Sequence, residues 1–120
     1  QGDEVLDQAL TDLLRQARPG EHCAVVAGNS VVTLRVAAAV SRLGWTFGQQ
    51  LGFVGFDDPE WASLIRPGLS AVAQPTDAIG QRAAQCLLER IGGLQGPARE
   101  SLLPGLLVVR GSSLGSEAAV

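Results

Sequence analysis

Two adjacent carboxylates, Asp57 and Asp58, follow directly on the apolar run 51–56, and Pro59 comes next. Carboxylates at the end of a buried strand suit several kinds of chemistry: catalysis, coordination of a hard cation, or binding of the hydroxyl groups of a ligand. The same residues also form a common turn, because an Asp side chain accepts hydrogen bonds from nearby backbone N–H groups. The pattern alone leaves the turn and the binding site equally open.

The other residue types of the chain disfavour catalysis. A magnesium site usually adds a further carboxylate or a lysine, but the chain has no lysine, and Asn29 and Gln74, at other predicted strand ends, are neutral. A nucleophile needs a neighbouring base, and the single histidine, His22, lies at the start of a predicted strand, opposite the ligand-bearing end. The stretch "AGNSV" lacks the glycine pattern of a phosphate-binding loop. We therefore expect no enzyme, no cofactor and no metal.

The elements that would position these polar residues alternate along the chain. Apolar residues at helical spacing predict three helices, over residues 3–17, 31–43 and 76–91. Short apolar runs predict four strands, over residues 22–27, 51–56 and 69–74 and within 102–111. Ser30 is expected to cap the second helix, and the final "SSLGSEAAV" is interpreted as a frayed tail. This order predicts an α/β fold with a largely parallel sheet, whose carboxyl edge would carry Asn29, Asp57 and Gln74.

Composition limits the chain to one compact domain without a nucleic-acid surface. It has 120 residues, of which 46% are hydrophobic and 18% charged, as in globular proteins. The net charge is −3 and the arginines are scattered, which argues against a basic face for nucleic acid. Cys23 and Cys86 lack metal-ligand spacing and are interpreted as reduced, partly buried thiols. Neither a membrane-spanning run nor a signal peptide is visible.

Several motifs, in the right order and spacing, resemble the lactose/galactose repressor (LacI/GalR) family of bacterial transcription regulators. They are "FVGFDD", "PGLSAVAQP" and "IGQRAAQCLL", together with "AVVAGNSVVTLRVAAAVSRLGW" upstream and "LLPGLLVVRGSS" at the end. The resemblance covers nearly all of residues 3–113. It implies an α/β, partial periplasmic-binding-protein-like (Rossmann-like) fold of three layers with a mostly parallel sheet. Residues 3–113 would form part of the effector-binding core, and 114–120 a disordered tail.

The resemblance also assigns roles to individual residues. Asn29, Phe56, Asp57 and Gln74 match positions that line the effector cleft of the family, whereas Asp58 matches a turn or capping position. Segments used for dimerisation of the core match Leu34, Trp61, Leu64 and Ile65.

Two residues and the extent of the chain depart from the family pattern. Ser30 stands where an aspartate is usual, which removes one carboxylate, and Arg35 stands near a position usually held by a small residue. The family's helix-turn-helix domain, most of its N-terminal subdomain and the first strands of its C-terminal subdomain would precede Gln1. We therefore expect an exposed sheet edge and apolar face, and a chain that associates with itself or belongs to a longer one.

The resemblance implies the effector-sensing and dimerisation region of a cytoplasmic, repressor-type regulator without catalysis. A small sugar-like effector (a sugar, a sugar acid or a similar molecule) would bind in the cleft, and the homodimer would reach operator DNA only through the missing N-terminal domain. A sugar-binding protein of an ABC transporter is the alternative, because it shares the fold. A third hypothesis, a Mg²⁺-dependent enzyme using Asp57 and Asp58, would require measurable binding of a divalent metal.

Overall fold

The computed structural model describes residues 2–115, and its elements follow the predicted order. The helices are α1 (Gly2–Gln16), α2 (Ser30–Arg42) and α3 (Thr76–Ile91). The strands are β1 (Ala24–Val26), β2 (Gly52–Phe56), β3 (Ser70–Ala73) and β4 (Leu106–Val108). Two short 3₁₀ helices follow β2 and β4: η1 (Glu60–Ser63) and η2 (Gly111–Ser113). The predicted helices and strands are thus confirmed, with several strand ends one or two residues shorter than expected.

The four strands form one sheet in the order β1-β2-β3-β4, with the first three parallel and β4 antiparallel to β3. This confirms the mostly parallel sheet. Val54 of β2 pairs with Val26 of β1 on one side and with Ser70 of β3 on the other. Because the three parallel strands run in register, their carboxyl ends reach the same edge of the sheet.

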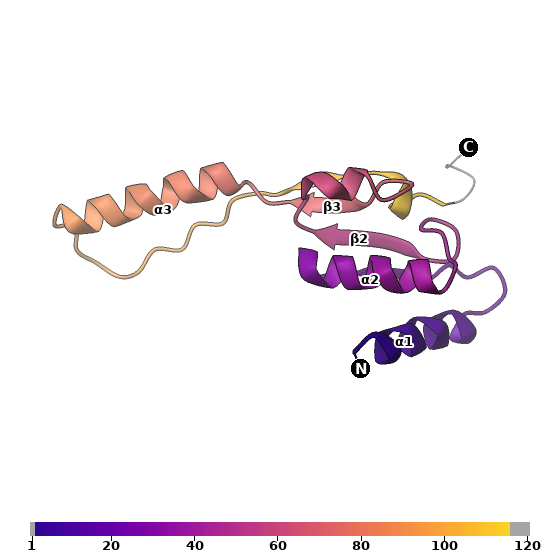
Figure 1. Cartoon of the computed structure of the whole chain (residues 1–120). Coiled ribbons are helices and arrows are strands. Elements are labelled where there is room, and N and C mark those ends of the chain that lie inside the picture. The colour runs from indigo at the N-terminus through magenta and orange to yellow at the C-terminus, as the bar shows by residue number, and fades with distance from the viewer. Residues whose placement is uncertain (1, 116–120) are drawn as a thin grey trace.

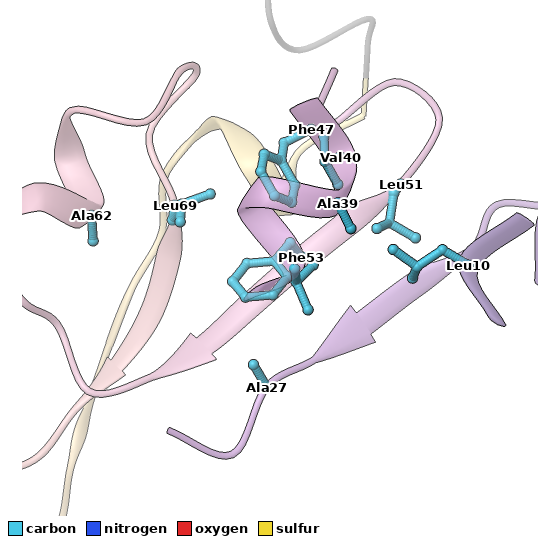
Figure 2. Packing of buried hydrophobic residues seen from close by; sticks show 10 residues of the cluster. Leu10, Ala27, Ala39, Val40, Phe47, Leu51, Phe53, Ala62 and Leu69 are labelled. Carbon is cyan, nitrogen blue, oxygen red and sulfur yellow. The ribbon is translucent and has the colours of Figure 1, made fainter. Parts of the chain in front are cut away.

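One face of the sheet is covered by α2, and α1 lies beside α2 on the same side (Figure 1). Phe53 is 1% exposed, and its ring lies 5.3 Å from that of Phe47. Gly55 lets α2 approach closely, because a Cβ there would lie 3.0 Å from Thr33 Oγ1. Figure 2 shows this core, whose labelled residues are Leu10, Ala27, Ala39, Val40, Phe47, Leu51, Phe53, Ala62 and Leu69.

The opposite face of the sheet is largely uncovered. Strand alternation and register place Val26, Phe56 and Leu107 on it, and these side chains are 76%, 37% and 57% exposed. Strand β1 is also an open edge of the sheet within residues 2–115. The expected exposed edge and apolar face are therefore present, while self-association stays a prediction.

One compact domain was expected as an upper limit for this chain, and the described residues are less compact than that, because α3 projects away from the sheet (Figure 1). The radius of gyration is 18.8 Å, whereas a compact chain of this length has about 14 Å. Every residue of α3 is at least partly exposed, including Ile79, Leu87, Leu88 and Ile91. The predicted helix is confirmed. Residues 99–103 run beside Ile79, Ala83 and Cys86, but the rest of its apolar side is uncovered within residues 2–115. Helices in proteins gain most of their stability from packing of an apolar face, so we expect a partner surface to cover α3.

The interpretation of "SSLGSEAAV" as a frayed tail is wrong for its first two residues. The Ser112 side chain is fully buried; its hydroxyl donates to the Phe53 carbonyl at 2.7 Å and accepts from the Ser70 N–H at 2.8 Å. The Ser113 hydroxyl contacts that of Ser70. Hydroxyl-to-backbone bonds thus fasten η2 to β2 and β3. The expected disordered tail falls mostly on residues 116–120, which lie outside the described residues.

We expect Ser112→Ala to lower the free energy of unfolding of the intact protein by about 1–3 kcal/mol, because it leaves a buried N–H and a buried carbonyl without a partner. Ser63→Ala is the matched control, since the Ser63 hydroxyl is exposed and bonds only to the nearby Glu60 carbonyl. Urea unfolding of both variants measures the difference. Equal losses for the two variants would contradict the role assigned to Ser112.

Candidate functional site

The carboxyl ends of β2 and β3 border one open hollow of about 490 Å³. Asp57 and Gln74 meet in it, because Gln74 Nε2 donates a hydrogen bond to Asp57 Oδ1. The residues lining the hollow are Asp57, Asp58, Pro59, Ala73, Gln74 and Thr76. Parallel strands thus bring together two of the residues expected to bind an effector. Their role as ligand contacts stays a prediction.

Asp57 is held in an unusual backbone conformation. Its φ is +77°, in the left-handed region that Asp adopts more readily than most residues with a side chain. Its N–H donates to the Val72 carbonyl of β3 at 2.9 Å. The backbone therefore turns sharply at the end of β2 and leaves the half-buried Asp57 carboxylate at the hollow, beside Gln74.

Asp58 has a different partner from Asp57. Its two carboxylate oxygens accept hydrogen bonds from Arg110 at 2.7 and 3.0 Å, and Arg110 Nη1 also donates to the Leu69 carbonyl at 2.7 Å. The Arg110 hydrogen bonds lower the pKa of Asp58, and they outweigh the opposing effect of burial. Asp58 is therefore structural, through an ion pair rather than the expected turn cap.

Arg110 is the residue that sequence reasoning missed. It lies 52 positions from Asp58 in the sequence, and it is one of nine arginines scattered along the chain. The signal that could have found it is the arginine inside the closing motif "LLVVRGSS", which is part of the resemblance to the family but carried no role for Arg110.

Asn29 lies at the carboxyl end of β1 but does not line the hollow. Its side-chain Oδ1 accepts from the Val32 N–H at 2.9 Å, so Asn29 rather than Ser30 caps α2. The prediction of Ser30 as the cap is wrong because Asn29 has the extended conformation that a cap requires, whereas Ser30 is the first helical residue. The Asn29 amide group remains a donor. Phe56 lies on the uncovered face of the sheet.

The four residues expected at a dimer interface fall into two groups. Trp61 and Ile65 are half-buried and pack against the core from the η1 segment. Leu34 and Leu64 are 50% and 77% exposed. Leu34 and Leu64 are therefore the two that present apolar surface.

The cysteines and the remaining acidic residues of the described part form no second candidate site. Cys23 and Cys86 are free and half-buried, as predicted. Between residues 2 and 115, His, Cys, Asp and Glu form no cluster of three or more that could hold a metal ion. None of the helices in that described part combines the length and apolarity of a bilayer crossing.

Residues 1–113 match the model of a family described as periplasmic binding protein-like domain. The HTH-type transcriptional regulator PtxS of Pseudomonas aeruginosa is 35% identical over 94% of this chain and 33% of its own length. The chain belongs to the lactose/galactose repressor family of periplasmic binding protein-like domains. The HTH-type transcriptional regulator KdgR of Bacillus subtilis is 34% identical over 78% of this chain. The chain spans a quarter to a third of the length of these curated relatives.

Solved structures of the same family agree with this assignment. A regulator from Enterococcus faecium with bound ribose is 25% identical, with a TM-score of 0.73 over 93% of this chain and 40% of that one. The Lac repressor dimer bound to operator and an anti-inducer is 27% identical, with a TM-score of 0.71 over 92% of this chain and 32% of that one. The expected periplasmic-binding-protein-like fold is thereby confirmed.

The Asp58–Arg110 pair predicts a specific dependence of stability on pH. Because Arg110 lowers the pKa of Asp58 in the folded protein, the stabilisation is complete above the unfolded carboxyl pKa of about 3.9 and is lost as the pH falls through the folded value. We expect Asp58→Asn to be less stable than wild type at pH 7 and the difference to shrink on acidification. Urea unfolding of the intact protein between about pH 7 and pH 3 measures it.

The control for this prediction is an Arg110→Gln background, in which the cause of the pKa shift is removed. There, Asp58→Asn should change the free energy of unfolding by an amount that varies little with pH. A difference between wild type and Asp58→Asn that is constant over the whole pH range would refute the proposed coupling.

Proposed function

We propose that this chain is the effector-sensing and dimerisation region of a repressor-type transcription regulator. A small sugar-like molecule binds at the hollow where Asp57 and Gln74 meet, and no reaction is catalysed there. The observation that carries the proposal is this contact between a carboxylate and an amide at the carboxyl edge of a parallel sheet, where α/β folds bind ligands.

The polar groups at this edge suit a ligand with several hydroxyl groups. The Asp57 carboxylate accepts hydrogen bonds, while the Gln74 amide both donates and accepts them. Neighbouring hydroxyls of a sugar or sugar acid can use both kinds of partner at once. In Asn29 only Oδ1 takes part in the capping bond, so its amide NH₂ group offers a further donor at the same sheet edge. The ribose bound to the Enterococcus faecium regulator supports this class of ligand.

The position of Gln74 suggests how binding would be sensed. Asp57 ends β2 in the body of the sheet, whereas Gln74 ends β3 just before the chain leaves toward α3. A ligand that bonds to both residues restrains the direction in which α3 leaves the sheet. The effector thereby favours one of two arrangements of the full protein and changes its affinity for operator.

The partners follow from the relatives together with the exposed apolar residues. A homodimer of the core would cover Leu34 and Leu64, and the Lac repressor structure is a dimer on operator. In the proposed regulator, operator DNA is bound by a domain outside this chain, in the cytoplasm. A transporter's sugar-binding protein has the same fold, and a signal peptide instead of a helix-turn-helix before Gln1 would favour it.

Asp57→Ala in the intact regulator should abolish the effector response while leaving operator binding intact. Asp57→Asn should also weaken effector binding, by roughly ten- to a hundredfold, because it removes a charged acceptor yet tolerates the left-handed turn. The effector comes from a thermal-shift screen of sugars and sugar acids, and the response is measured as its effect on operator affinity.

Glu60→Ala is the matched control, because Glu60 is an exposed carboxylate three residues along that does not line the hollow. It should respond to effector like wild type. A normal response in both Asp57 variants would overturn the assignment of the site.

A further inference from the structure

Arg110 is fixed at both of its ends, although it does not line the hollow. Its guanidinium makes three hydrogen bonds, two to the Asp58 carboxylate and one to the Leu69 carbonyl. Its backbone N–H donates to Ser70 Oγ at 2.7 Å, and its carbonyl accepts from the same hydroxyl at 3.0 Å. Ser70 is itself fully buried. A long, flexible side chain is thus held in one place by the core of the sheet.

The path of the Arg110 side chain depends on a glycine. Gly68 has φ of +94°, and a Cβ there would lie 3.1 Å from Arg110 Cδ. The aliphatic part of Arg110 therefore lies against Gly68, with no room for a side chain between them. This packing directs the guanidinium to Asp58, where the pair is only 23% and 20% exposed.

Asp57 lies between two anchored points. On one side its own N–H is bonded to Val72 of β3, and on the other the next residue, Asp58, is held by Arg110. A residue with a side chain keeps a left-handed φ only when its surroundings enforce it. Without Arg110, the turn would lose its outer anchor, and a second, unpaired carboxylate would stand beside that of Asp57.

We propose that Arg110 is a positioning residue of the effector site: through Asp58 it holds Asp57 in its left-handed turn, with the carboxylate beside Gln74. This rests on the proposed function for its consequence, which is effector affinity, but its geometric content is independent of any ligand. Arg110 touches no effector. It makes the site rigid before binding, and a preorganised site binds more tightly because less ordering is left to be done.

A second ion pair in the chain provides a matched control. Arg42 donates to both carboxylate oxygens of Asp7, at 3.0 and 2.7 Å, and joins α2 to α1. Like Arg110–Asp58, this pair has two hydrogen bonds, although Arg42 uses Nε and Nη2 where Arg110 uses Nη1 and Nη2. Neither of its residues lines the hollow. Loss of Arg42 therefore removes a two-bond ion pair without touching the turn at Asp57.

The test compares wild type, Arg110→Gln, Arg110→Lys and Arg42→Gln in the intact protein. Crystal structures of the four give the φ of Asp57 and the Asp57–Gln74 contact without any effector. Calorimetric titration with D-ribose, D-xylulose and D-gluconate gives the Kd. In Arg110→Gln we expect Asp57 to leave the left-handed region, its contact with Gln74 to break, and the Kd to rise about tenfold or more. Arg42→Gln should keep both the geometry and the Kd.

Arg110→Lys distinguishes the effect of positioning Asp57 from the effect of the positive charge. It also serves as the test variant if Arg110→Gln does not fold. Lysine retains the positive charge but cannot make the two-bond contact, so the Kd should lie between those of wild type and Arg110→Gln. An unmoved Asp57 in both Arg110 variants would overturn the proposal, as would an equal rise in Kd for Arg42→Gln. If Asp57 moves but wild type binds none of the three sugars, the positioning role stands and the proposed effector class fails.

Discussion

The arrangement of this chain depends on one constraint, which is that buried polar groups must be paired. The Ser112 hydroxyl satisfies a carbonyl of β2 and an N–H of β3 at once, and the Ser70 hydroxyl satisfies both backbone groups of Arg110. Among the described residues, no buried side-chain nitrogen or oxygen lacks a partner. These bonds fasten the last strand to the sheet. They thereby place Arg110 at Asp58, and through Asp58 they hold the turn at Asp57.

The core that these bonds complete lies on one side of the sheet and combines the Phe47–Phe53 pair with aliphatic residues. Where no large side chain fills the space, backbone elements approach closely, as at Gly55 beneath α2. The other face of the sheet and most of the apolar side of α3 stay exposed within residues 2–115. Large exposed apolar surfaces usually mark sites of contact with another surface, so we expect these two to be covered in the intact protein.

The features that could be predicted from the sequence are those set by neighbouring residues, namely the helices, the strands and the shared edge at which parallel strands end. The periods of the apolar residues gave the elements, and the rule that parallel strands end at one edge brought Asp57 and Gln74 together. The contacts that the sequence did not predict are those between distant residues: Asp58 with Arg110, and Ser112 with Phe53 and Ser70. Neither charge nor composition singles out one arginine among nine. The direction of α3 was equally hidden, because an apolar stripe shows that a helix needs a partner but not where that partner lies.

Two backbone segments join α3 to the sheet, both at the end where β3 stops and β4 begins. Gln74 and Pro75 lead from β3 into α3, and residues 92–105 lead from α3 back to β4, which is antiparallel to β3. A helix of 16 residues is about 24 Å long, and a swing of about 10° at its base moves its far end by roughly 4 Å. The lever starts two residues after Gln74, so a displacement too small to alter the sheet is enlarged at the distant end of the helix.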